Sequence, residues 1–425
     1  MGLSLFGGLA GILVLGMPIA IALLIATGIS VFFFSETSLI VLVQRLFVSL
    51  DSFSLMALPF FMIAGGLLEK GGVSKRIVNF ANSIVGGLPG GLAIVAFVAA
   101  AFFGAISGSS TATVIAIGAI LVPTMLKEGY DIRFSVTTLA AAGILGTIIP
   151  PSIPMVTFGV STGASIGDLF SGGIIPGILL TFLMSVYAYL YGKKNIKVEY
   201  KFSFAKILRT FKEAIWALLM PLIIIGGIYS GIFTATEAAA VACLYGLIVG
   251  IFVYKELKLN VVKDIMEGAV INSAMIMFIV GAAAAFGYVM TKARIPAELS
   301  QFIVSLTDNP YILLLLINVL LLIIGTFMET NAAILIVAPI FTPIILEYGI
   351  DPIHFGVMMI VNLSIGMITP PLGVNLFVAA KLKDGLKVND LLNKHLGMYL
   401  LVCIVGLLLI TYIEDLVLFI PNLLK

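Results

Sequence analysis

The stretch Gly104-Ala-Ile-Ser-Gly-Ser-Ser-Thr-Ala-Thr113 interrupts a long apolar run with small and hydroxylated residues. About one helix later, Gly146-Thr-Ile-Ile-Pro-Pro-Ser-Ile-Pro154 interrupts the next apolar run with a proline pair. The same order returns as Gly325-Thr-Phe-Met-Glu-Thr-Asn-Ala-Ala333 and then Gly366-Met-Ile-Thr-Pro-Pro-Leu-Gly-Val-Asn375. Paired, interrupted apolar segments at matching positions of two halves are typical of the binding site of a membrane transporter. The two pairs of breaks are therefore the candidate site.

One interval relates the two copies. Pro370 follows Pro150 by 220 residues, and Asp351 follows Asp131 by the same number. The regular interval indicates that the two segments share one local structure, so the motifs form an internal repeat rather than a chance similarity.

Composition places this structure in a membrane. Of the 425 residues, 61% are hydrophobic and only 10% are charged, which is too apolar for a water-soluble chain of this length. A lipid bilayer is therefore the expected surroundings. The net charge of +2 argues against a nucleic-acid partner. No Walker loop, His/Cys cluster or Ser/His/Asp set is present, so the chain is not expected to be an enzyme.

Loop charges predict the orientation of the two copies. Residues 193–212 contain seven basic residues and one acid, which makes this loop cytoplasmic by the positive-inside rule. The first proline-broken helix then starts in the cytoplasm after Arg133, whereas the second ends there at the lysines of 381–394. The copies run in opposite directions, as an inverted repeat. Taking Leu3–Phe34 as one membrane helix places the N-terminus in the cytoplasm and the C-terminus in the periplasm.

The predicted fold is an all-α membrane protein with about nine crossings, two re-entrant helical hairpins and two broken helices. The hairpin arms of 16 residues are roughly 24 Å long, short for a hydrocarbon core of roughly 30 Å. Two full membrane spans in place of each re-entrant hairpin would leave the following segments on the same side of the membrane, so this alternative stays open. The expected domains are the first scaffold helices and an interfacial helix at 1–85, and the first transport repeat at 86–170. Scaffold helices follow at 171–306, with a cytoplasmic amphipathic arm at 193–212. The second transport repeat is expected at 307–395 and a last helix at 396–425.

The breaks offer oxygen atoms. Each proline leaves the carbonyl four residues earlier without its helical partner, which frees Gly146, Thr147, Gly366 and Met367. Oxygens converging inside a membrane suit a small hard cation, and Na⁺ is the candidate. The N-termini of the half-helices after the prolines favour an anionic substrate group. All five arginines lie in turns or at segment ends, so bound cations and side-chain donors are expected to hold a carboxylate.

Other interpretations remain open at this point. The hydroxylated residues near Ser107 suit close helix packing in lipid, and a proline pair is compatible with a plain kink. Glu329, an acid within an apolar hairpin, could bind Na⁺, carry a proton, accept substrate hydroxyls or be a neutralised structural acid. A channel and a non-transporting scaffold are the rival functions.

The assembled motifs resemble the large membrane subunit of TRAP (tripartite ATP-independent periplasmic) transporters over nearly the whole chain. The motifs are Leu58-Pro-Phe-Phe-Met-Ile-Ala-Gly65, Ser107-Gly-Ser-Ser-Thr-Ala-Thr113, Gly146-Thr-Ile-Ile-Pro-Pro-Ser152, Gly231-Ile-Phe-Thr-Ala-Thr-Glu-Ala-Ala239 and the stretch from Gly366 to Asn375. The resemblance implies a Na⁺-driven, elevator-type importer of carboxylates in the bacterial inner membrane. It also implies two partners, a small four-helix membrane subunit and a periplasmic substrate-binding protein.

The resemblance also implies site residues. Sodium positions carry over to Ser107, Ser110, Gly146, Ile149 and Pro151 in one half, and to Gly325, Met328, Gly366 and Thr369 in the other. Substrate contacts are expected at Ser107, Ser152 and Glu329, together with Ser109, Asn331 and Asn375 of the same motifs.

In overall likeness the chain is nearest to the sialic-acid (N-acetylneuraminate) branch, which makes sialic acid the expected substrate. It departs from many dicarboxylate members by carrying Glu329 where they carry Asp, and Ala235 where they carry Pro. The alternatives are a C4-dicarboxylate or other carboxylate TRAP subunit, and a stand-alone Na⁺/carboxylate symporter without a binding protein.

Overall fold

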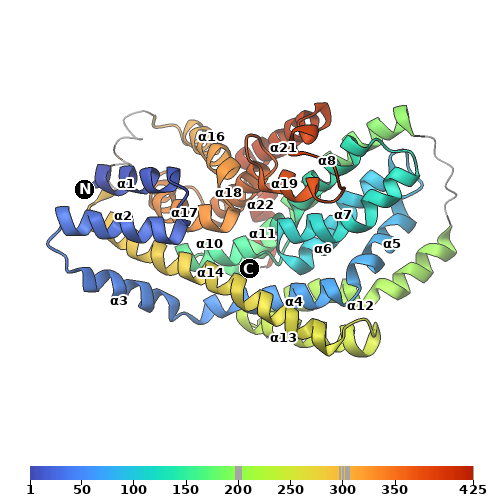
Figure 1. Cartoon of the computed structure of the whole chain (residues 1–425), viewed down its shortest axis with the longest axis horizontal. Coiled ribbons are helices and arrows are strands. Elements are labelled where there is room, and N and C mark those ends of the chain that lie inside the picture. Colours follow the sequence, from blue (N-terminus) through green and yellow to red (C-terminus); the bar gives the residue numbers. More distant parts are fainter. Residues whose placement is uncertain (197–202, 296–297, 299–300, 302–306, 425) are drawn as a thin grey trace.

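The computed structural model describes residues 1–196, 203–295, 298, 301 and 307–424, which form helices and no strand (Figure 1). Within these ranges nine helices are long and apolar enough to cross a membrane. A tenth span is present if the two helices Ile132–Ile148 and Ile153–Thr162, bent by 42°, count as one. The prediction of an all-α membrane protein is confirmed. Lys197, Glu199 and Lys201 of the basic loop, and the domain boundary at 306, lie outside the described residues.

The two hairpins repeat at the predicted interval. The first consists of α6 (Gly91–Ser107) and α7 (Ser110–Lys127), and the second of α16 (Pro310–Phe327) and α17 (Thr330–Glu347). Helix α17 begins and ends 220 residues after α7. The side chains of Ser109 and Glu329 accept backbone N–H groups at the starts of these two helices. The arms have 17 or 18 residues, slightly longer than predicted, because each helix continues by one or two residues beyond the predicted arm.

The two broken helices also match. The first contains α8 (Ile132–Gly143), α9 (Leu145–Ile148) and α10 (Ile153–Thr162), and the second contains α18 (Pro352–Gly366) and α19 (Val374–Ala380). Asp131 caps α8 and Asp351 caps α18, with their Oδ1 atoms 2.9 and 2.7 Å from the N–H nitrogens of Phe134 and Ile353. Both proline pairs are joined by cis peptide bonds.

The repeats interlock reciprocally. Helix α10 of the first broken helix packs on α17 of the second hairpin, and α19 of the second broken helix packs on α7 of the first hairpin. Each half therefore supplies the partner of the other half's hairpin, as a two-fold relation requires.

The remaining helices surround this unit. Helix α4 packs against both α13 and α14, and α11 packs against α6 and α21 (Figure 1). The capping box predicted at Thr234 and Glu237 is present at the start of α13. The bounds are α3 (Leu39–Leu50), α4 (Ala57–Lys70), α5 (Val73–Val85), α11 (Ile166–Asn195), α12 (Phe204–Tyr229), α13 (Ala235–Ile248), α14 (Leu259–Lys292), α20 (Val388–Leu391), α21 (Lys394–Tyr412) and α22 (Asp415–Leu424).

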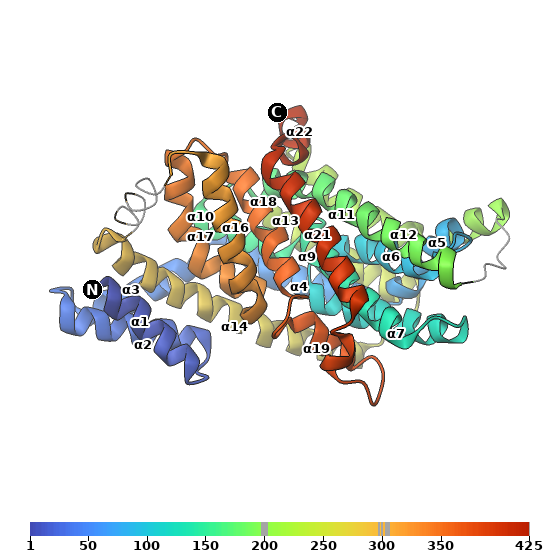
Figure 2. The same cartoon turned by 90° about the horizontal axis from the view of Figure 1, so that it is seen from above.

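The prediction of one first membrane helix over Leu3–Phe34 is wrong. The segment forms two antiparallel helices, α1 (Gly2–Val14) and α2 (Ile19–Phe34), which lie side by side in Figures 1 and 2. The hydroxyls of Ser4 and Ser30 lie 3.1 Å apart across the pair. Gly16 adopts a φ of +78°, a conformation that glycine tolerates, and the chain reverses there instead of bending.

Candidate functional site

Both hairpin tips and both breaks meet at one cavity of about 620 Å³. One wall comes from the repeats and is rich in polar groups. The opposite wall comes from α4 and α14. The repeat wall is lined by residues 107–112, Thr147, Ile153, Glu329, Asn331 and Met367, and the other wall by Met62, Gly65, Gly66, Glu69, Lys70, Val261, Asp264, Ile265, Gly268, Ala269, Asn272, Met275, Ile276 and Ile279.

The first hairpin tip folds against the first break. The Ser107 hydroxyl lies 3.2 Å from that of Thr113, and Thr113 donates to the Ser109 carbonyl at 2.7 Å. A Cβ atom added to Gly146 would lie 2.5 Å from the Ser109 carbonyl oxygen, so only glycine allows this approach. At Gly108 an added Cβ would lie 3.2 Å from the Pro151 carbonyl oxygen. Ser107, Gly146 and Pro151, three of the expected sodium positions, therefore surround one tip.

The second tip has an equivalent arrangement. A Cβ atom on Gly366 would lie 2.5 Å from the Cα atom of Gly325, so the two backbones touch. The Gly373 N–H donates to the Thr326 carbonyl at 3.2 Å, which ties the second break to the tip. Gly325 and Gly366 are thus brought together. Thr369 lies three residues after Gly366, and its hydroxyl donates to Ile365 at 2.9 Å.

The three remaining expected sodium positions, Ile149, Met328 and Ser110, lie at a break or a tip but do not take part in these glycine contacts. Ile149 is the residue after α9, and its side chain faces Gly177 of α11. Met328 is the residue after α16 and is half-buried. Ser110 lines the cavity, but its hydroxyl already accepts a hydrogen bond from Asn375.

Three of the carbonyls freed by proline accept hydrogen bonds within the chain. The Ser152 hydroxyl donates to Thr147, the Thr369 N–H donates to Gly366, and the Asn375 N–H donates to Met367. Each carbonyl oxygen has a second lone pair, which leaves it capable of binding a cation. These three carbonyls are therefore satisfied internally and are not left bare.

Four of the six expected substrate residues line the cavity: Ser107, Ser109, Glu329 and Asn331. Ser152 and Asn375 are buried beside it, and both make hydrogen bonds within the protein. The structure thus places these two among the groups that support the wall.

Glu329 is held at the start of α17. Its carboxylate accepts the N–H groups of Asn331 and Ala332 at 2.9 and 3.3 Å and the side-chain amide of Asn331 at 2.9 Å. A carboxylate at this helix N-terminus also faces the positive end of the helix dipole. Glu329 therefore both caps the hairpin and presents an acid to the cavity.

Hydrogen bonds between the repeats fix the two tips relative to each other. Asn331 of α17 accepts from the Thr157 hydroxyl at 3.0 Å. The hydroxyls of Thr147 and Ser364, one in each broken helix, lie 2.7 Å apart.

Sequence reasoning missed the second wall. It considered only arginines as cations within reach of a substrate, yet Lys70 lines the cavity, together with Glu69, Asp264 and Asn272. The backbone of α4 even reaches the first tip, because a Cβ on Gly65 would lie 3.2 Å from the Ser107 Cα atom. The available signal was Asn272 itself, an amide within a largely apolar run.

Comparison with known proteins agrees with this architecture. The family model "Tripartite ATP-independent periplasmic transporter, DctM component" matches residues 6–416. The isethionate TRAP transporter permease protein DctMQ of Oleidesulfovibrio alaskensis is 46% identical over 98% of this chain, which spans 65% of that longer protein. The C4-dicarboxylate TRAP transporter large permease protein DctM of Pseudomonas aeruginosa is 41% identical over 93% of this chain and 92% of the relative.

A solved structure matches in fold. The Alcanivorax borkumensis YdaH transporter aligns with a TM-score of 0.63 over 87% of this chain and 86% of that one, at 19% identity. The family match covers almost the whole chain and includes both hairpins and both breaks. The chain therefore belongs to the DctM-component family of tripartite ATP-independent periplasmic transporters, whose members are membrane transport proteins and not enzymes.

Proposed function

We propose that this protein is the large membrane subunit of a Na⁺-driven importer that carries an organic anion across the bacterial inner membrane. The observation that carries the proposal is the cavity onto which both hairpin tips open, with Gly146 packed against the first tip and Gly366 against the second. At least one Na⁺ is proposed for each half, which gives two or more in a transport cycle.

The charges around the cavity support coupling to cations. Its lining contains three acids, Glu69, Asp264 and Glu329, and one base, Lys70, so the formal charge is −2. An anion entering alone meets this negative potential, whereas bound Na⁺ ions offset it. Anion binding is therefore expected to require Na⁺.

For the substrate we propose a small organic acid. The two relatives are named for isethionate and for C4-dicarboxylates, both compact anions. A cavity of about 620 Å³ is within the range of small-ligand sites and also admits sialic acid. Sialic acid, the substrate expected from sequence, stays a prediction to be tested beside the smaller anions.

We further propose the elevator mechanism and both partners. The segments 86–170 and 307–395 would move together, because the hydrogen bonds between the repeats join them into one unit. The segments 1–85 and 171–306 would form the static scaffold. A small four-helix membrane subunit and a periplasmic binding protein that delivers substrate complete the proposed assembly.

The N-terminus is assigned to the periplasmic side, in place of the cytoplasmic side expected from a single first helix. The start of α1 and the end of α2 both lie near the C-terminal end of α14. There Lys292 donates to Thr37, and a Cβ on Gly2 would lie 3.7 Å from Ile295. The opposite end of α14 follows Lys255 and Lys258, which favour the cytoplasm. The C-terminus remains assigned to the periplasm.

The test is uptake into proteoliposomes that contain this chain and the small subunit. Isethionate, succinate and sialic acid are offered with and without a Na⁺ gradient, and with and without the periplasmic binding protein. The proposal expects saturable uptake that needs both Na⁺ and the binding protein. Uptake without the binding protein would instead indicate a stand-alone symporter, and non-saturable flux would indicate a channel.

A further inference from the structure

The α14 wall of the cavity contains one uncharged polar side chain, Asn272. Its neighbours along that face are Gly268, Ala269, Met275, Ile276 and Ile279. The spacing of three, four and seven residues places all of them on one side of the helix. Asn272 is exposed, and within the described residues its amide has no hydrogen-bond partner.

The adjacent residue, Ser273, provides a contrast. It is not among the residues that line the cavity, is 5% exposed, and its hydroxyl lies 3.3 Å from the sulfur of Met62 on α4. Of two consecutive polar residues in an apolar helix, one is therefore satisfied by the protein and the other faces the cavity. Polar groups inside membrane segments are costly and mark functional positions when they face a polar cavity.

Asn272 also lies near the level of the first hairpin tip. The contact between Ser273 and Met62 shows which part of α14 lies beside which part of α4. Gly65, which touches the backbone of Ser107, is three residues beyond Met62, roughly 4.5 Å along the helix axis. A small anion between the tip and α14 is therefore within reach of both walls.

We propose that Asn272 is a specificity-determining residue that hydrogen-bonds a hydroxyl or carbonyl group of the transported organic anion. This inference rests on the proposed function and adds the part of the substrate that the α14 wall recognises. An amide offers two N–H donors and one oxygen acceptor and has no charge, so it suits a neutral oxygen rather than the acid group. The acid group would face the hairpin tips and their cations.

A site built to bond a hydroxyl discriminates strongly against an analogue that lacks it, because its polar group is then left unpaired. Hydroxylated anions should therefore bind better than their deoxy analogues, and Asn272 should be the cause. Isethionate with ethanesulfonate, and malate with succinate, are the first two pairs.

The experiment measures Na⁺-dependent uptake of both members of each pair in proteoliposomes containing the complete transporter. For the wild type, the hydroxylated member should have the lower KM. Asn272→Leu should raise that KM by about tenfold or more, the loss of one hydrogen bond, and leave the deoxy member within about twofold. Asn272→Gln, which keeps the amide, should retain part of the preference. Ser273→Ala is the matched control and should change neither KM.

The results separate the two levels of inference. Absence of Na⁺-dependent anion uptake by the wild type would reject the proposed function itself. With uptake established, the inference about Asn272 is overturned by a wild type with no preference within either pair, by equal losses for both members, or by an unchanged preference in Asn272→Leu. If Asn272→Leu does not fold, the comparison of Asn272→Gln with Asn272→Ala, which has no polar side-chain group, decides in the same way.

Discussion

The side-chain amide of Asn375 donates a hydrogen bond to the Ser110 hydroxyl at 2.7 Å, although the two residues are 265 positions apart. The same amide donates to the Ala140 carbonyl at 3.2 Å. Asn375 thereby joins α19 of the second repeat to α7 and α8 of the first, at a point fully shielded from solvent.

Replacing Asn375 should destabilise the joined repeats. Asn375→Ala removes both donors and leaves buried oxygens on Ser110 and Ala140 without their partner, which costs about 1–3 kcal/mol. The measurement is thermal unfolding of the purified protein, in which the midpoint should fall. Asn422→Ala, at an exposed asparagine of α22, is the control and should leave the midpoint unchanged. Equal midpoints for the two variants would contradict the assigned role.

A methyl group at Gly366 should disrupt the second break. The added carbon would lie 2.5 Å from the Gly325 backbone, and neither backbone has a flexible side chain that could yield. Such overpacking costs about 1–3 kcal/mol. Gly366→Ala should therefore lower the unfolding midpoint and weaken the stabilisation of the protein by added Na⁺. Gly397→Ala in α21, where no atom lies within 4 Å, should be neutral or stabilising.

Glu329→Gln separates the charge of this residue from its capping role. The amide oxygen of glutamine can still accept N–H groups at the start of α17, so the midpoint should stay close to wild type. Loss of the negative charge should nevertheless reduce Na⁺-dependent uptake. Glu329→Ala should in addition cost about 1 kcal/mol through loss of the cap. Glu237→Gln makes the same change at the start of α13, away from the cavity, and is the control that should leave uptake unchanged. Undiminished transport by Glu329→Gln would show that Glu329 is not part of the site.

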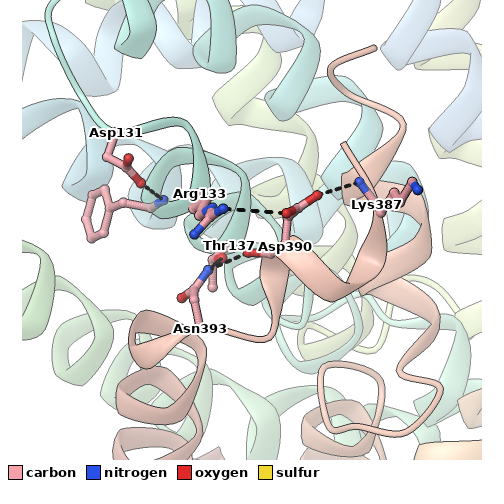
Figure 3. Close-up of polar contacts among 7 residues, drawn as sticks. Asp131, Arg133, Thr137, Lys387, Asp390 and Asn393 are labelled. Atoms are coloured by element: carbon pink, nitrogen blue, oxygen red, sulfur yellow. Dashed lines mark hydrogen bonds and ion pairs between the residues drawn. The ribbon is translucent and has the colours of Figure 1, made fainter. Parts of the chain in front are cut away.

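The segment between α19 and α21 makes two polar contacts with α8, and the two are expected to differ in strength (Figure 3). Arg133 and Asp390 pair at 3.7 Å with the arginine side chain 60% exposed, so Arg133→Gln should cost no more than about 1 kcal/mol. Asn393 caps α21 through the N–H groups of His395 and Leu396 and also donates to Thr137. Asn393→Ala should cost about 1–2 kcal/mol. Thermal unfolding compares the two, and a larger loss in Arg133→Gln would reverse this ranking.

The repeat could be predicted because its signals are local. Proline pairs, capping acids such as Asp131 and Asp351, and hydroxylated tips all act within a few residues of themselves, and the common interval then located the second copy. The direction of the chain after Gly16 was not predictable in the same way. An apolar run followed by Gly-Met-Pro is compatible with a bend or with a reversal, and packing between α1 and α2 decides between them.

The second wall of the cavity was missed for a different reason. Lys70, Asp264 and Asn272 belong to segments that are not repeated, and only the tertiary structure brings them opposite Ser107 and Glu329. Likewise the internal hydrogen bonds of Ser152 and Asn375 depend on neighbours that proline spacing does not reveal. The wall formed by the repeats could therefore be predicted from local sequence motifs, whereas the wall formed by α4 and α14 depends on long-range packing.

The close approach of Gly65 to Ser107 bears on how the first tip would move in the proposed elevator mechanism. At this point the main chain of α4 meets the main chain of the tip, because a Cβ on Gly65 would lie 3.2 Å from the Ser107 Cα atom and 3.4 Å from its carbonyl oxygen. In the proposed elevator movement such a contact would favour sliding of the tip along α4, and a bulkier residue at position 65 would oppose it.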